Sequence, residues 1–397
     1  MERRLEIDAL RGLMLVWMTL VHVPTLLTPW VNQPVGFLSA SEGFIFLSAL
    51  FTGRIYYRLL SREGPRAMQR KLLLRTARLY AFHVGLLLLL FVVAARIASG
   101  DRTPALYNLL HFYFAAGPGR AVPDSLMLIY RPPLLDIIPL YITFLFLSPF
   151  VLLITGRRAR GWKYLLAASA LIWLGAQLGL GRTLYAALAH DFNVRVPINE
   201  MGAFNLWAWQ FMWIFGMWCG VRWARDELPV QRWAARAWIP GVAVALVLLA
   251  ARYAQLLGVD IGPSALYDKW HLGVARLVDF AAVAAILVRF RDALEPLAAR
   301  PLVMMGQASL YVFCAHFVFC FAGLALSGSS DHVAGWLQFA LLAVTFAALL
   351  GVARLFMRAE ISAPPRPARA AAGPLAAPAV SGAVTLTVRP GRPVRPK

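Results

Sequence analysis

The chain has 397 residues, 60% of them hydrophobic, and its mean hydropathy is +0.64. This composition excludes an ordinary soluble protein and predicts an all-α polytopic membrane protein. The formal net charge of +20 would suit a nucleic-acid partner. The basic residues, however, stand in short loops between apolar runs, as they do in membrane proteins, so no nucleic-acid partner is expected.

Ten apolar runs are long enough to be transmembrane helices. They lie at about 9–29, 36–57, 72–95, 134–155, 162–181, 206–224, 236–257, 272–290, 302–326 and 333–357. If the N-terminus is cytoplasmic, 30 of the 39 Lys and Arg residues fall on the cytoplasmic side and eight on the outer side. The positive-inside rule therefore predicts that both termini are cytoplasmic.

Two regions differ in composition. Residues 1–360 are expected to form one transmembrane domain, whereas 361–397 are rich in Pro, Ala and Arg. The second region is typical of a disordered cytoplasmic tail whose arginines contact anionic membrane lipid. The three cysteines lie in apolar runs and are interpreted as small core residues, and no metal-ligand cluster is visible, so no metal is expected.

The first two predicted spans carry three ionisable residues, Arg11, His22 and Glu42. Eleven residues separate Arg11 from His22, which puts them on one helix face about 16 Å apart. Glu42 should lie at the depth of His22 on a neighbouring helix. A carboxylate there would fix the imidazole tautomer and leave the second nitrogen free as a base. The alternative is that His22 only packs between helices.

The third predicted span begins with two arginines, Arg75 and Arg78. Because they are three residues apart, they occupy adjacent helix positions and could together bind a phosphorylated donor. His83 lies deeper on roughly the face of Arg75. The alternative is that both arginines only mark the cytoplasmic end of the span.

Other polar residues stand in or beside the predicted spans. Arg276 and Asp279, three residues apart, are predicted to form an ion pair within one helix. The outer loops combine carboxylates with aromatic residues, which suits carbohydrate, although ordinary polar loops with an interfacial aromatic belt look the same. Residues that could line a cavity are Asp136, Asn205, Gln210 and His316.

Several motifs resemble a known superfamily. DALRG, the spacing of Arg11 and His22, the run that starts at Glu42, and the pair Arg75 and Arg78 resemble the integral-membrane acyltransferase-3 superfamily. QPVGFLSASEGFIFLS, LLDIIPLY and FN-x-x-AWQ are similar to the OpgC family, the succinyltransferases of osmoregulated periplasmic glucans. The resemblance covers most of residues 1–357. One departure is Ala49, where the superfamily usually has glycine.

The resemblance implies an O-acyltransferase of the bacterial inner membrane. Its donor would be an acyl-CoA, with succinyl-CoA expected, and its acceptor a hydroxyl of a periplasmic glucan. His22 would be the general base, either directly or through an acyl-histidine. The implied sites are catalytic at His22, Glu42 and Arg11, donor-binding at Arg75, Arg78 and His83, and substrate-binding at Asp136, Asn205, Gln210 and His316.

Two alternatives stay open. The first is an O-acetyltransferase that modifies another cell-surface polysaccharide. The second, from a different class, is a proton-coupled secondary transporter, because buried His, Glu and Arg residues also form proton relays. Inverted repeats would favour a transporter, and the sequence contains none that we recognise.

Overall fold

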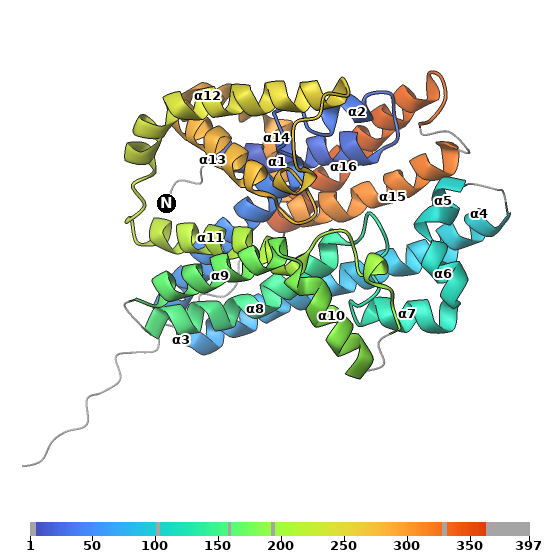
Figure 1. Cartoon of the computed structure of the whole chain (residues 1–397), viewed down its shortest axis with the longest axis horizontal. Helices are drawn as coiled ribbons and strands as arrows, with labels where there is room; N and C mark the ends of the chain where they lie inside the picture. Colours follow the sequence, from blue (N-terminus) through green and yellow to red (C-terminus); the bar gives the residue numbers. More distant parts are fainter. Residues whose placement is uncertain (1–4, 101–103, 158–159, 192–194, 328–331, 363–397) are drawn as a thin grey trace, which may run out of the picture.

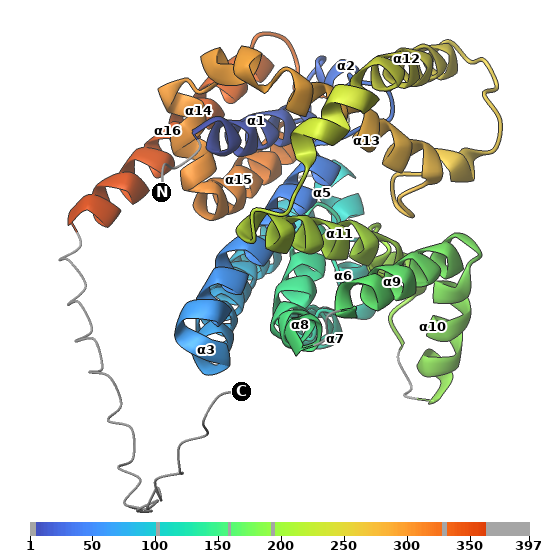
Figure 2. The ribbon, with the colours of Figure 1, turned by 90° about the vertical axis from the view of Figure 1, so that its left-hand side faces the viewer.

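The computed structural model describes residues 5–100, 104–157, 160–191, 195–327 and 332–362. Within these ranges it contains helices and no named strand, which confirms the predicted all-α class. The helices form two groups, which lie one above the other in Figures 1 and 2. The upper group is α1 (Leu5–His22), α2 (Thr28–Val31), α12 (Val230–Leu256), α13 (Val274–Arg289), α14 (Arg300–Gln307), α15 (Ser309–Ser327) and α16 (Leu337–Ser362).

The lower group is built on α3, against which α8 and α11 pack. α9 packs on α11, and short helices lie at the right-hand end of this group in Figure 1. Its members are α3 (Ala40–Leu88), α4 (Ala95–Gly100), α5 (Pro104–Leu109), α6 (His111–Ala116), α7 (Pro118–Leu126), α8 (Ile137–Arg157), α9 (Gly161–Gln177), α10 (Leu180–Asp191) and α11 (Leu206–Ala224). A π-helical stretch runs over Leu89–Ala94, and 3₁₀ turns over Ile198–Glu200, Ser264–Leu266 and Arg291–Leu297.

Helix α3 reverses direction at Gly64. This residue has φ 83° and ψ 178°, a backbone conformation that glycine tolerates, and Pro65 follows it. Residues 23 positions apart in a straight helix would lie about 35 Å apart. Arg75 nevertheless reaches Thr52, with its Nη1 3.4 Å from Oγ1. The two halves of α3 therefore run antiparallel, and Arg75 is brought beside residues of the preceding half.

Glycines allow close contact between the principal helices. A Cβ added at Gly216 or Gly220 of α11, or at Gly53 of α3, would strike the backbone of the facing helix. Small residues of this kind permit the close approach typical of membrane helices. Ala49 is fully buried and faces Gly216, so the methyl group that departs from the superfamily pattern is accommodated by a glycine opposite.

Five helices in the described ranges are long and apolar enough to cross a membrane, or six if the bent pair α9 and α10 forms one broken span. One of the five, Ala40–Gly100, contains the reversal at Gly64 and so holds two of the predicted spans. These helices support a multi-pass membrane protein. Ten crossings and cytoplasmic termini stay predictions, and most of the predicted tail, 363–397, lies outside the described residues.

Candidate functional site

His22 is the last residue of α1. The sequence predicted one helix over 9–29 with His22 deep inside it, and this is wrong because the helix stops two residues before Pro24. Proline has no N–H to donate and restricts the residue before it, so helices commonly end at this distance. His22 therefore stands at a helix end, and the residue as a whole is partly exposed.

His316 of α15 is the partner of His22. Nδ1 of His22 lies 3.2 Å from Nε2 of His316, and the rings stack with centroids 5.5 Å apart. Nδ1 of His316 bonds to the carbonyl oxygen of Phe313 and must therefore carry the proton of that ring. Nε2 of His316 is then an acceptor, so Nδ1–H of His22 donates to it. This arrangement leaves the lone pair on Nε2 of His22.

Glu42 does not bond to His22, and the predicted direct pairing is wrong. One carboxylate oxygen accepts from the backbone N–H and the hydroxyl of Ser39, at 3.1 and 2.6 Å. The other accepts from Arg276 of α13, whose Nε lies 2.7 Å away and whose Nη2 also donates. Both Glu42 and Arg276 are 0% exposed. The carboxylate that was expected to orient the histidine is instead half of a buried ion pair.

The predicted ion pair between Arg276 and Asp279 is also wrong. Oδ2 of Asp279 accepts from the backbone N–H groups of Phe37 and Leu38, at 2.7 and 3.1 Å. The turn that presents these groups requires φ +63° at Gly36, where a Cβ would collide with the carboxylate. Arg276 and Asp279 of α13 thus both hold the start of α3.

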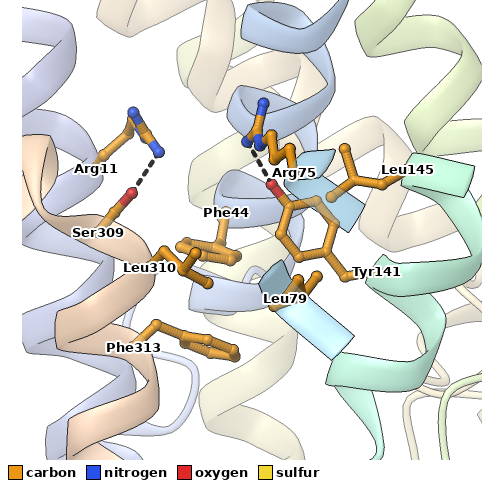
Figure 3. Close-up of a pocket in the computed structure, with 9 residues that line it drawn as sticks. All are labelled: Arg11, Phe44, Arg75, Leu79, Tyr141, Leu145, Ser309, Leu310 and Phe313. Atoms are coloured by element: carbon orange, nitrogen blue, oxygen red, sulfur yellow. Dashed lines mark hydrogen bonds between the residues drawn. The ribbon is translucent and has the colours of Figure 1, made fainter. Parts of the chain in front are cut away.

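A cavity between the two helix groups contains two arginines (Figure 3). Arg11 of α1 donates to the hydroxyl of Ser309, and Arg75 of α3 donates through Nη2 to the Tyr141 hydroxyl at 2.8 Å. The remaining lining residues are Phe44, Leu79, Leu145, Leu310 and Phe313. Two guanidinium groups in an otherwise largely apolar cavity suit an anion, because arginine donors match phosphate and carboxylate oxygens.

The other residues predicted to bind the donor lie elsewhere. Arg78 is exposed, and His83 is fully buried with its ring 6.5 Å from that of Tyr80. Neither lines the cavity. The structure therefore combines Arg75 with Arg11, from another helix, and does not bring Arg75 and Arg78 together in one clamp.

Two phenylalanines, Phe44 and Phe313, lie between the cavity of the two arginines and the histidine pair. Phe313 lines the cavity, stacks on Phe44 at 5.1 Å, and lies 5.4 Å from the ring of His316. α15 contributes one residue to the arginine cavity and one to the histidine pair. Ser309 lies beside Arg11, and His316 lies beside His22. The separation of seven residues between Ser309 and His316 places them on one helix face. That periodicity was visible in the sequence, but neither Ser309 nor Tyr141 was predicted as a site residue.

Three predicted substrate-binding residues hold structural bonds. Oδ2 of Asp136 accepts from the N–H of Ala203 at 2.9 Å. Asn205 caps α11, because its side chain accepts from the first free N–H groups of that helix. Gln210 joins α11 to Ser169 of α9 through its amide oxygen at 2.6 Å. Contact of these three side chains with an acceptor stays a prediction.

An aromatic cluster lies in and beside the loop that precedes α13. Lys269 stands 5.0 Å from the ring of Trp270 and 6.0 Å from that of Phe204. Burial lowers the pKa of this lysine from its ordinary value. Nε1 of Trp209 donates to the carbonyl oxygen of Trp270 at 3.2 Å and ties the loop to α11. Trp207 and Trp270 are each about 40% exposed and present ring surface.

The family model described as "OpgC protein" matches residues 3–361. The chain belongs to the OpgC family. This confirms the family predicted from the motifs and indicates an acyltransferase-like function. No curated protein and no solved structure was found to match the chain. Support for acyl transfer beyond the family match therefore comes from this chain's own geometry. It consists of an oriented imidazole and a cavity lined by two arginines.

Proposed function

We propose that the protein is an inner-membrane O-acyltransferase that moves a succinyl group from succinyl-CoA to a hydroxyl of a periplasmic glucan. The observation that carries the proposal is the Nδ1–Nε2 contact of 3.2 Å between His22 and His316, which leaves Nε2 of His22 as a base. Membership of the OpgC family supports acyl transfer. The excess of basic residues in the predicted cytoplasmic loops supports the orientation.

The cavity of Arg11 and Arg75 would take the phosphates of CoA. Both arginines lie on the predicted cytoplasmic side of His22, where CoA is found. Arg75 bonds to neutral hydroxyls, among them those of Tyr141 and Thr52. Arg11 and His22 are about 16 Å apart along α1. An extended pantetheine arm along Phe44 and Phe313 would place the thioester at the histidine.

Nε2 of His22 would take the proton of the acceptor hydroxyl as its oxygen attacks the thioester carbonyl. The new ester C–O bond forms, the C–S bond breaks, and the leaving sulfur receives the proton from His22. His316 is a positioning residue in this step, since it accepts from Nδ1–H and holds the tautomer. It takes over the orienting role that the sequence gave to Glu42.

The exposed rings of Trp207 and Trp270 support a carbohydrate acceptor, because ring faces pack on sugar rings. The proposal is tested with the purified chain in detergent, glucan, and either succinyl-CoA or acetyl-CoA. Free CoA thiol and the mass of the glucan are measured. A mass increase of one succinyl group supports the proposal. Acetylation would indicate the alternative acyl donor, and no transfer from either donor would contradict acyl transfer.

Replacing Arg75 with glutamine should raise the KM for the acyl-CoA, because a phosphate contact inside the cavity is lost. We expect an increase of about 10–100-fold, from the loss of a charge-assisted bond of ~1.5–3 kcal/mol. Arg78→Gln is the matched control, since this exposed arginine does not line the cavity. Equal KM values for the two variants would contradict the assignment.

Replacing His316 with leucine should lower kcat about 100-fold, the lower end of the range for an acid–base contribution. The KM for acyl-CoA should change little, because His316 does not line the cavity. His316→Gln should recover part of the rate, since its amide oxygen can accept from Nδ1–H of His22. If the glutamine and leucine variants are equally slow, or if KM rises with kcat unchanged, His316 does not position the base.

A further inference from the structure

A third side chain with a possible metal-ligand atom lies beside His22 and His316. Cys320 lies one helical turn after His316 on α15, with a free thiol that is 0% exposed. One ligand atom of each residue, two ring nitrogens and the sulfur, lies within 4.8 Å of the others. From the sequence, all three cysteines were expected to be core residues, and no metal was expected. Among the described residues this is the group of His, Cys, Asp or Glu whose side chains converge closely enough for a metal ion.

The arrangement has the geometry of a metal site. Residues four apart on a helix share a face, so His316 and Cys320 can bind one ion together. Two nitrogens bound to a tetrahedral zinc, each at about 2.1 Å, lie roughly 3.4 Å apart. The nitrogens of His22 and His316 are already 3.2 Å apart. The Nδ1–H of His316 also donates to the Phe313 carbonyl oxygen. A hydrogen bond from the second ring nitrogen typically orients a metal-bound histidine.

We propose that His22, His316 and Cys320 form a binding site for a d¹⁰ cation of the zinc type, and that the bound cation inhibits the enzyme. Two imidazoles and one thiolate are ligands that zinc accepts, and the fourth position stays open to water. Partial exposure of His22 provides the route of entry.

The ion and the catalytic proton transfer exclude each other. In the metal-free ring Nδ1 of His22 carries the proton and Nε2 has the lone pair. Binding of the ion through Nδ1 moves that proton to Nε2 of the same ring, and the thiol proton of Cys320 passes to solvent. Nε2 then carries a hydrogen and cannot accept one from the acceptor hydroxyl. This inhibitory half of the inference rests on the proposed role of His22, whereas the binding itself does not.

The test uses the full chain in detergent and two cysteine variants. Co²⁺ is the spectroscopic probe, because a thiolate bound to cobalt gives a charge-transfer absorption band. Cys320→Ala removes a ligand, and Cys314→Ala is the matched control, another buried cysteine of α15 that is outside the cluster. We expect the band in the natural chain and in Cys314→Ala, its loss in Cys320→Ala, and displacement of Co²⁺ by Zn²⁺.

Acyl transfer is then measured as Zn²⁺ is added. The natural chain and Cys314→Ala should lose activity together. Cys320→Ala, with normal activity before zinc is added, should need more than about 10-fold more Zn²⁺ for half inhibition, since loss of a ligand costs at least as much as loss of an outer-shell contact. A band that is absent from the natural chain, or unchanged in Cys320→Ala, overturns the site. A band without inhibition by Zn²⁺ overturns the inhibitory role. Absence of acyl transfer before zinc is added contradicts the proposed function instead, and the cobalt band still decides the site.

Discussion

Replacing His22 with alanine is expected to abolish acyl transfer, with a fall in kcat of about 10²–10⁴-fold or more, because general bases contribute a factor of this size. The reason is that Nε2 of His22 carries the lone pair that accepts the proton, because Nδ1 of this ring is occupied by the contact with His316. Loss of a polar group from a helix end should not hinder membrane insertion. The measurement is release of CoA thiol by equal amounts of purified, inserted protein.

His190→Ala is the matched control, since this histidine is exposed at the end of α10 and its Nδ1 lies 3.2 Å from the carboxylate of the neighbouring Asp191. It should keep the activity of the natural chain. If His22→Ala retains ordinary activity, the proposed mechanism is wrong, although membership of the OpgC family is unaffected. If both histidine variants lose activity together with protein level, the loss reflects folding and the role of His22 is not supported.

The helices themselves were predictable from the sequence. Each of the ten predicted spans overlaps a helix, because apolar runs of sufficient length form helices wherever the backbone cannot bond to water. The end of α1 at His22 also had a local signal in Pro24, although the apolar run continues past this proline. The reversal of α3 at Gly64 was expected as a loop between two spans, and the glycine and proline there are local signals of the same kind.

The partners of the charged residues were not predictable in the same way. Rise per residue gives the depth of a side chain, and on depth alone Glu42 was a good partner for His22. The choice depends on how each helix is rotated and on which helices adjoin, and these are set by packing between distant segments. The contact of His22 with His316 joins residues 294 positions apart, and that of Arg276 with Glu42 joins residues 234 apart. A helix period within one segment carries no information about such pairs.

Glu42→Ala should destabilise the folded protein by about 3–5 kcal/mol, the cost of leaving one charge of a buried ion pair without its partner. Arg276 is 0% exposed and donates to Glu42 through both Nε and Nη2, so the variant leaves a cation in the core beside α3. Thermal unfolding in detergent and the yield of monodisperse protein measure the effect.

The double variant Glu42→Leu/Arg276→Met separates a structural role from a catalytic one. Replacing both members of a buried pair with apolar residues of similar volume is often neutral, so the double variant should recover stability relative to Glu42→Ala. It should also recover acyl transfer, because neither residue bonds to His22 and neither lines the cavity of Arg11 and Arg75. A stable double variant that transfers no acyl group would mean that Glu42 or Arg276 acts in the chemistry. The mechanism would then need a carboxylate in addition to His316.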